Sequence, residues 1–397
     1  MKECISVILG SDENAYGCAS ALYSLTGEKP LVLCAKPLIP TSYSSILDRR
    51  VIPELDSRSV FLKTMTALLP ELKKRAKKVT VTACSDYYAD LLIKEQNVLK
   101  EYISSPILSE EVYSLFKTKS DFHRLCVRYS VPHPKTETVL PYNALGVTRD
   151  REFPVVLKPS NSNSYEYLHS TIRDRRKVYI CKSEAELKAA LEAFVCDGYN
   201  EPAVIQEYIG GDERYYRVVN AYCDHSGRVR VIGAGMPLLE YKGAGEIGSY
   251  AAVRTVSDRA LCDLCADLLE SIGYVGFANF DAKISPVTGK TVLFELNPRQ
   301  GRSSYFINAA GQSLMSAMYS DAVLDMPYSG RKYAENEAVW LAEPFYAVRS
   351  EMKRRGLDVD LLNGVPRVSS VTLKGDMSVP RALLLAKRSL TAFTGRL

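Results

Sequence analysis

Two acidic residues in a predicted β-hairpin have the types and spacing of a cation site. The segment FANFDAKISPVTGKTVLFELNPR contains two strand-like runs joined by a Pro-Val-Thr-Gly turn near Thr288. With the turn centred there, Asp281 faces Glu295, and Asn297 lies on the same face as Glu295 because side chains alternate along a strand. Carboxylates that face each other repel unless a cation lies between them. Two carboxylates and an amide oxygen suit Mg²⁺ held together with substrate phosphates.

A polar hairpin face exposed to water is the alternative interpretation of the same residues. Apolar residues flank the polar ones on both strands, namely Phe277, Phe280, Leu293, Phe294 and Leu296. Large apolar side chains belong mainly to protein interiors, so a fully solvated face fits this sequence poorly. The pattern therefore favours a cation site.

Basic residues supply the positive charge that a phosphate-transfer site needs. Arg299 follows Asn297 by two residues, and Arg302 lies nearby. A guanidinium beside a metal site can hold a phosphoryl or carboxylate group through two parallel hydrogen bonds. Lys158 ends the apolar run VVLK, where a lysine either reaches past apolar surface to water or points at phosphate. Lys119 is a second candidate, although alone it would pass as a surface residue of a helix.

This set of residues resembles the ATP-grasp superfamily. Members present two lysines to the phosphates of ATP, an acidic hinge segment to the adenine and ribose, and an Asp, Glu and Asn trio to magnesium. The resemblance implies ATP as substrate and Mg²⁺ as cofactor, with the hairpin residues Asp281, Glu295 and Asn297 as metal ligands. Lys119 and Lys158 would contact the phosphates. Lys158 and Arg299 would be catalytic, because they neutralise charge on the transferred phosphoryl group and the oxyanion.

The hinge and the phosphate loop of that superfamily have counterparts in this chain. The hinge, QEYIGGDE (206–213), would meet the adenine through Glu207 and the Ile209 backbone, and the ribose through Glu213. The segment SNSNSYEYLHST (160–171) would cover the phosphates. It departs from the family pattern because it has no glycine, yet a Ser/Asn turn can still present backbone amides to phosphate. The remaining predicted nucleotide contacts are Ser160, Asn161, Ser162 and Tyr208.

Three segments, ILGSDENAYGCA, KPSNS and FELNPRQGRSSY, resemble the D-aspartate ligases of Gram-positive bacteria. In that family D-aspartate is activated at its β-carboxyl and joined to the lysine side-chain amine of a peptidoglycan precursor. The resemblance implies an ATP-dependent ligase that forms an acyl-phosphate from a small carboxylic acid and joins it to an amine. Two alternatives stay open: another ATP-grasp amino-acid or dipeptide ligase, and a nucleotide-binding regulator without turnover. The intact hairpin residues argue against the regulator.

The polar turn after the first predicted strand is a candidate substrate pocket. It lies at the carboxyl end of a strand in a predicted parallel sheet, where such sheets bind ligands. Ser11, Asn14 and Tyr16 offer neutral hydrogen-bonding groups there, and Arg302 would pair with the second carboxylate of a diacid. An ordinary strand–helix connection is the alternative.

Strands that alternate with helices are expected to position these residues. The first strands are predicted at 3–10, 31–36 and 78–85. This alternation predicts a parallel sheet in an N-terminal α/β (pre-ATP-grasp) domain over residues 1–108. The resemblance adds a two-lobed ATP-grasp domain of α+β type over 109–330, with its small lobe at about 151–210. A C-terminal extension, 331–397, would pack on or beside that core.

Composition excludes several classes of protein. Apolar residues make up 46% and charged residues 24%, as in ordinary globular proteins. A formal net charge of +5 is too mild for a nucleic-acid binder but suits anionic ligands. No apolar run reaches the roughly 18 residues of a membrane span, and the start of the chain lacks a signal-peptide cleavage site. A cytoplasmic location is therefore expected, and the oligomeric state stays open, a dimer included.

The end of the chain predicts a partly amphipathic helix with a basic side. Its sequence, PRALLLAKRSLTAFTGRL, mixes leucines with Arg381, Lys387, Arg388 and Arg396. Pro380 suits the first turn of such a helix. The helix either packs its leucines on the core or makes a weak contact with an anionic membrane surface.

Overall fold

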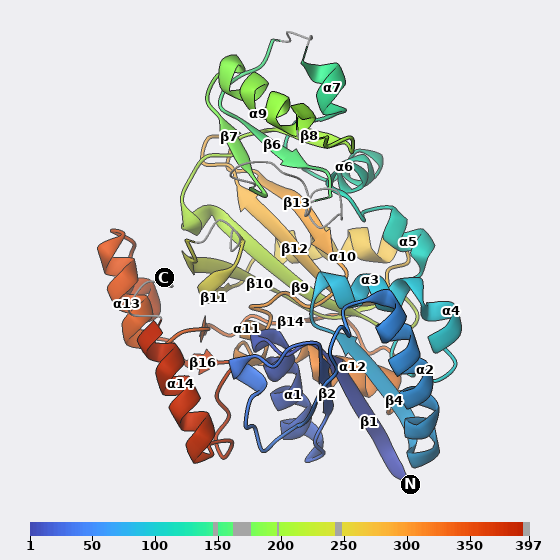
Figure 1. Cartoon of the computed structure of the whole chain (residues 1–397). Coiled ribbons are helices and arrows are strands. Elements are labelled where there is room, and N and C mark those ends of the chain that lie inside the picture. Colours follow the sequence, from blue (N-terminus) through green and yellow to red (C-terminus); the bar gives the residue numbers. More distant parts are fainter. Residues whose placement is uncertain (146–149, 162–175, 197, 243–247, 392–397) are drawn as a thin grey trace.

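The described part of the chain forms three β-sheets, with helices packed around them (Figure 1). The computed structural model describes residues 1–145, 150–161, 176–196, 198–242 and 248–391. A parallel sheet occupies the N-terminal part, a small antiparallel sheet stands at the top of the view in Figure 1, and a large sheet lies between them. The predicted α/β class with a parallel N-terminal sheet is confirmed.

The N-terminal sheet has the strand order β3-β2-β1-β4, and all of its strands are parallel. Its strands are β1 (Lys2–Leu9), β2 (Leu31–Cys34), β3 (Asp48–Val51) and β4 (Ala76–Ala83). Its connecting elements are α1 (Glu13–Thr26), η1 (Ile39–Thr41), α2 (Arg58–Arg75), α3 (Asp86–Lys94) and α4 (Gln96–Leu99). Strand β3 was missed from the sequence because DRRV is a short, charged and largely exposed edge strand.

The small sheet is antiparallel, with the strand order β5-β8-β6-β7. Its strands are β5 (Thr136–Val139), β6 (Val155–Pro159), β7 (Tyr179–Cys181) and β8 (Ala203–Glu207). The neighbouring helices are α5 (Glu110–Ser114), α6 (Lys119–Arg128), α7 (Pro141–Ala144) and α9 (Glu184–Cys196). Helix α9 covers one face with Leu187, Leu191 and Phe194, which join the buried core of this lobe.

The large sheet has the order β13-β12-β9-β10-β11-β15-β16, and β14 pairs with β10. Its strands are β9 (Tyr216–Cys223), β10 (Val229–Glu240), β11 (Tyr250–Val256), β12 (Gly276–Ile284), β13 (Thr291–Asn297), β14 (Lys332–Tyr333), β15 (Val339–Leu341) and β16 (Arg367–Ser369). The other elements are η2 (Glu213–Tyr215), α10 (Arg259–Ser271), α11 (Phe306–Ala309), α12 (Leu314–Ala322), α13 (Phe345–Arg354), η3 (Val359–Leu362) and α14 (Val379–Thr391).

One buried core joins the N-terminal helix α1 to the large sheet through α12. Tyr16 of α1, Met318 of α12, Tyr222 of β9 and Trp340 of β15 all belong to this cluster and are fully buried. Burying a large apolar side chain contributes about 1.5–3 kcal/mol to the free energy of unfolding. This core therefore fixes the turn after β1 against the loop after β13, where the candidate site lies.

Helix α14 differs from both arrangements predicted for it. Arg381 and Arg388 are buried, whereas Leu383 and Leu390 are each 68% exposed. Two arginines seven residues apart face the protein, where acidic side chains neutralise them. Leu384 and Leu385 are half-buried, so only part of the predicted leucine face packs on the protein. Two of the four cations expected to face lipid are thus unavailable to it. Among the described residues, no helix has the length and apolarity needed to span a bilayer.

Candidate active site

The hairpin β12–β13 has the register that the sequence predicted. Asp281 lies directly opposite Glu295, and Asn297 lies opposite Asn279. The turn is closed by hydrogen bonds from the Ser285 amide to the Lys290 carbonyl and from the Gly289 amide to the Ser285 carbonyl, at 2.8 Å each. Gly289 has a φ of 68°, a conformation that glycine adopts at no steric cost. The pairing nearest the turn, Ile284 with Thr291, would by itself place Phe294 opposite Asp281. A register shift between Asp281 and Ala282 brings Glu295 opposite Asp281 instead.

The electrostatics of this pair fit a divalent cation. Burial and the facing Glu295 carboxylate raise the pKa of Asp281 to about 7. Lys119 Nζ lies 3.7 Å from Glu295 Oε1, so one lysine offsets part of the negative charge. Among the described residues, no three His, Cys, Asp or Glu side chains are grouped so that they could hold a metal ion. The donor set is thus two carboxylates and an amide, hard oxygen ligands of the kind that Mg²⁺ takes.

The third predicted ligand, Asn297, is held in one orientation. Its amide nitrogen donates to Asn279 Oδ1 at 3.2 Å. The loop after β13 then turns closely past this point, since the Gly301 amide donates to Asn220 Oδ1 at 2.7 Å. A Cβ atom at Gly301 would lie 2.8 Å from the Asn279 side chain, so only glycine fits there. This close approach brings Arg299 and Arg302 to the hairpin.

The two predicted phosphate lysines lie on different elements and near each other. Lys158 is on β6, where its Nζ donates to Gln206 Oε1 at 2.9 Å and lies 5.1 Å from the centre of the Phe294 ring. Burial and the charge of Lys119 lower the pKa of Lys158 to about 8. Lys119 is the first residue of α6, which begins with a capping box formed by Thr118 and Asp121. Two cations in partly buried positions suit the phosphates of a nucleotide.

The predicted phosphate loop is described only at its start. The Ser160 hydroxyl is buried, lies 2.8 Å from the Ser120 hydroxyl and accepts from the Ser120 amide at 3.3 Å. The Ser160 hydroxyl therefore joins the end of β6 to the first turn of α6, and a nucleotide contact of Ser160 stays a prediction. Asn161 is partly exposed at the edge of β6. Ser162 lies outside the described residues.

The predicted hinge follows β8 and is held by a lysine that the sequence analysis missed. Lys283 donates to the carbonyls of Ile209 at 2.9 Å and Gly211 at 3.0 Å. Lys283 is two residues from Asp281 on the same strand, so strand alternation alone places both on one face. Glu207 is exposed and accepts from the Lys135 amide at 3.2 Å.

The other predicted hinge contacts flank this backbone. Tyr208 is 38% exposed. Glu213 Oε1 lies 3.8 Å from Arg355 Nη1 at the start of η2. The predicted adenine contact through the Ile209 backbone stays a prediction.

Arg299 is held by a carboxylate from the N-terminal part of the chain. Its Nε lies 2.7 Å from Asp86 Oδ1, and its Nη2 donates to Asp86 Oδ2 at 3.0 Å. Asp86 opens α3 directly after β4, at the carboxyl edge of the parallel sheet. This position is a signal that could have identified Asp86 from the sequence.

Three of the predicted substrate ligands are engaged inside the protein. The Ser11 hydroxyl donates to the Lys36 carbonyl, and the Tyr16 hydroxyl donates to Asp376 at 2.6 Å. Asn14 donates to the Cys84 carbonyl at 3.3 Å and to the Gln300 carbonyl at 3.1 Å. All three are buried. The prediction that they line a substrate pocket is therefore wrong, because the turn packs against segments that are remote in sequence.

The acidic residues of the same turn lie beside the arginines instead. Asp12 caps α1 by accepting from the Ala15 amide at 3.0 Å and is only partly buried. Burial and Glu13 raise the pKa of Asp12 to about 6, while Arg302 and Arg299 oppose this shift. Arg302, the fourth predicted ligand, donates to both oxygens of Glu13, and 28% of its side chain is exposed. It remains a candidate for a substrate carboxylate.

Over 396 residues the chain is 33% identical to a D-aspartate ligase of Enterococcus faecium (strain Aus0004). This alignment covers 97% of the chain and 94% of that protein. The chain belongs to the D-aspartate ligase family. It is an ATP-dependent carboxylate–amine ligase, as predicted. No family model matches it.

Solved structures confirm the ATP-grasp fold of the ligase. An L-amino acid ligase from Bacillus licheniformis superposes with a TM-score of 0.58 at 13% identity, over 81% of this chain and 75% of that one. An N5-carboxyaminoimidazole synthetase from Staphylococcus aureus gives a TM-score of 0.59 at 12% identity, over 88% and 85%. At such identities the likeness concerns the fold alone.

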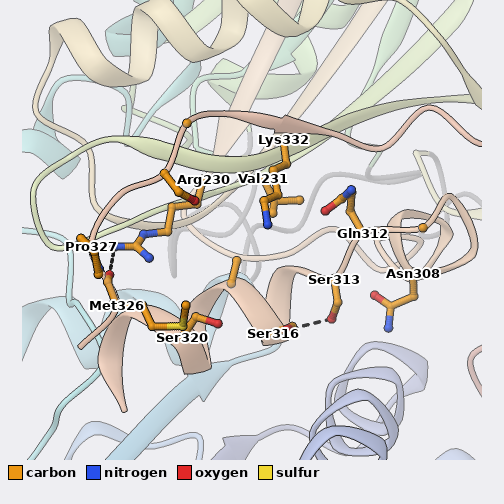
Figure 2. A pocket seen from close by; sticks show the side chains of 14 residues that line it. Arg230, Val231, Asn308, Gln312, Ser313, Ser316, Ser320, Met326, Pro327 and Lys332 are labelled. Atoms are coloured by element: carbon orange, nitrogen blue, oxygen red, sulfur yellow. Dashed lines mark hydrogen bonds between the residues drawn. The ribbon is translucent and has the colours of Figure 1, made fainter. Parts of the chain in front are cut away.

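A separate cavity of about 440 Å³ lies beside the first turn of α12 (Figure 2). Arg230, Ser313 and Lys332 are among the residues that line it. Arg230 there already pairs with Asp224 and donates to the Met326 carbonyl. None of the residues predicted to bind nucleotide, metal or acid lines this cavity, so it is not part of the ligase site described above.

Proposed function

We propose that this ligase activates the β-carboxyl of D-aspartate as an acyl-phosphate and joins it to the lysine side-chain amine of a peptidoglycan precursor. The name of the E. faecium relative, aligned over nearly the whole chain, supports the acid. The acceptor rests on the family resemblance. A cytoplasmic location, where ATP is available, belongs to the same proposal.

The pair of arginines after β13 is the observation that supports a dicarboxylic acid as substrate. Arg299 and Arg302 are each held by an acidic partner from the N-terminal part of the chain, Asp86 and Glu13. A diacid has two carboxylates for these two guanidiniums. Arg299 follows the metal trio most closely, so we assign it to the reacting carboxyl, and we assign Arg302 to the carboxylate that does not react.

In the first step an oxygen of the substrate β-carboxylate attacks the γ-phosphorus of ATP, and ADP leaves. Lys119 and Lys158 hold the phosphates and neutralise their charge, which is the main protein contribution to phosphoryl transfer. Mg²⁺, when held by Asp281, Glu295 and Asn297, supplies further positive charge to the phosphate oxygens. Lys283 fixes the hinge that would contact adenine and ribose.

In the second step the amine nitrogen attacks the acyl carbon, the bond to phosphate breaks, and an amide and inorganic phosphate form. Arg299 stabilises the negative charge on the acyl oxygen. The attacking ammonium must first lose a proton. We assign this proton to Asp12, a partly exposed carboxylate whose pKa Arg302 and Arg299 lower and burial raises.

An ADP-release assay with D-aspartate, L-aspartate and other amino acids tests this proposal, each with a lysine-containing peptide as acceptor. We expect ADP formation to require an acid, continued ADP release over many turnovers to require the amine as well, and D-aspartate to give the highest kcat/KM. A preference for a monocarboxylic acid would contradict the assignment of Arg302, and a preference for L-aspartate would contradict the stereochemistry.

A further inference from the structure

A buried chain of ion pairs connects the C-terminal helix to the substrate arginine. Glu13 accepts hydrogen bonds from Arg302 Nε at 3.1 Å and from Arg302 Nη2 at 3.2 Å. The same carboxylate accepts from Arg388 Nη2 of α14 at 2.5 Å. Glu13 and Arg388 are 375 positions apart in sequence. One carboxylate thus pairs both with Arg302, the candidate for binding a substrate carboxylate, and with the C-terminal helix α14.

The same Arg388 nitrogen has a second set of partners. Its Nη2 donates to Glu343 Oε1 at 3.2 Å and to the Ala342 carbonyl at 3.1 Å. Tyr241 donates to the same Glu343 oxygen at 2.8 Å, and its ring centre lies 5.5 Å from the Arg302 guanidinium. Two carboxylates and two guanidiniums form the group, so its net charge is zero.

This neutrality depends on Arg388. Glu13 and Glu343 are each 3% exposed, and Arg388 is 5% exposed. Burial alone would raise the pKa of Glu13, but Arg388 and Arg302 outweigh it and lower the pKa to about 2. Without Arg388, the buried Glu13 carboxylate would keep Arg302 as its ion-pair partner. Arg302 would then be drawn toward Glu13, and its charge would be compensated before any substrate arrives.

We propose that Arg388 is a positioning residue for the acid substrate, because it holds Glu13 and thereby keeps Arg302 available for the carboxylate that does not react. The proposal rests on the proposed function in assigning that carboxylate to Arg302. It makes helix α14 part of the substrate site and gives a role to an arginine that the sequence assigned to a basic helix surface.

The chain contains a matched control for this idea. Arg381 is on the same helix, seven residues earlier, and is fully buried. It pairs with Asp376 and donates to the carbonyls of Pro40, Ser42 and Val371. Arg381→Met therefore removes contacts of α14 that involve neither Glu13 nor Arg302. Arg388→Met removes contacts of α14 and also the ion pair with Glu13.

The test compares kcat and KM for wild type, Arg388→Met, Arg388→Lys and Arg381→Met with two acids. D-Aspartate carries both carboxylates, and β-alanine is the same skeleton without the α-carboxylate. For Arg388→Met we expect KM for D-aspartate to rise by about tenfold, the scale of one weakened charged contact, with KM for ATP unchanged. The ratio of kcat/KM for D-aspartate over β-alanine should fall by a similar factor. Arg388→Lys should recover part of both, and Arg381→Met should leave the ratio as in wild type.

Equal losses in Arg388→Met and Arg381→Met would overturn the proposal, because docking of α14 would then explain them. An unchanged acid ratio in Arg388→Met would also overturn it. The electrostatic part of the proposal is tested without measuring turnover. Carboxyl-carbon NMR of protein labelled at its glutamates measures the pKa of Glu13. We expect the pKa of Glu13 to rise in Arg388→Met and to stay low in Arg381→Met. Wild type that releases no ADP with D-aspartate contradicts the proposed function instead, and a Glu13 pKa that stays low in Arg388→Met contradicts the ion-pair chain by itself.

Discussion

Replacing Lys158 by methionine should stabilise the nucleotide-free protein while it abolishes nucleotide binding. Burial and Lys119 lower the pKa of Lys158 from 10.5 to about 8, so the charged form is disfavoured in the folded state. At about 1.4 kcal/mol per pKa unit, the penalty is roughly 3 kcal/mol at pH 7. It is fully present below pH 8 and disappears as the pH rises toward 10.5, the value of the unfolded chain.

Two favourable contacts are lost in the same variant and reduce the gain. The hydrogen bond to Gln206 contributes about 1 kcal/mol and the contact with the Phe294 ring about 0.5–1 kcal/mol. A net stabilisation of about 1–2 kcal/mol remains, which for a chain of 397 residues corresponds to a melting temperature about 1–2 °C higher at pH 7. At pH 10 the gain should be smaller than at pH 7.

Differential scanning calorimetry without nucleotide measures the first effect, and titration calorimetry with ADP measures the second. Lys188→Met is the matched control, because Lys188 is 59% exposed on the same lobe and pairs only loosely with Glu192. It should change neither quantity. A Lys158→Met protein that melts well below wild type but binds ADP normally would refute the reasoning and make Lys158 a structural residue.

Three further predictions concern the same site. Glu295→Gln should abolish ADP formation in a folded protein, since an amide cannot offset Mg²⁺ charge, and near-normal turnover at saturating Mg²⁺ would exclude the metal assignment. Asp86→Asn removes the ionic partner of Arg299, so kcat should fall by at least tenfold while KM for ATP stays unchanged in steady-state assays. In the wild type, kcat/KM for the amine should fall below about pH 6, where Asp12 becomes protonated. Asp12→Asn keeps a side chain that can cap α1 but has no base, so it should lose most of the activity and also this pH dependence. An unchanged pH profile would remove Asp12 from the mechanism.

The hairpin could be predicted because its information is local. Asp281 and Glu295 are only 14 positions apart, so the turn between them limits the pairing to neighbouring registers, and a shift of one residue between Asp281 and Ala282 completes it. The alternation of side chains would have identified Lys283, which shares a strand with Asp281. The alternating strands and helices likewise predicted the parallel sheet of the N-terminal part.

The partners of the arginines could not be predicted, because they depend on the tertiary fold. Arg299 meets Asp86 across 213 positions, and Arg302 meets Glu13 across 289. No sequence pattern around either arginine indicates which distant carboxylate it will contact. For the same reason the polar turn after β1 was misinterpreted: the loop after β13 and the segment before α14 fill the space where a pocket was expected.

Helix α14 shows a different cause of error. An alternation of leucine and arginine along a helix predicts apolar residues inside and charges outside. Here Glu13, Glu343 and Asp376 supply buried negative charge, so the arginines lie inside. Buried arginines occur only where they are paired, and the sequence of the helix alone does not show which distant carboxylates will neutralise its arginines.

The most direct test of the central claim follows oxygen from the acid to phosphate. D-Aspartate labelled with ¹⁸O in both oxygens of the β-carboxyl is incubated with ATP, Mg²⁺ and a lysine-containing acceptor peptide. Mass spectrometry then measures the label in inorganic phosphate and in the amide product. Activation as a β-acyl-phosphate predicts one ¹⁸O in each molecule of phosphate and one in each amide. Phosphate without label from the β-carboxyl, or with label only from α-labelled D-aspartate, would contradict the account.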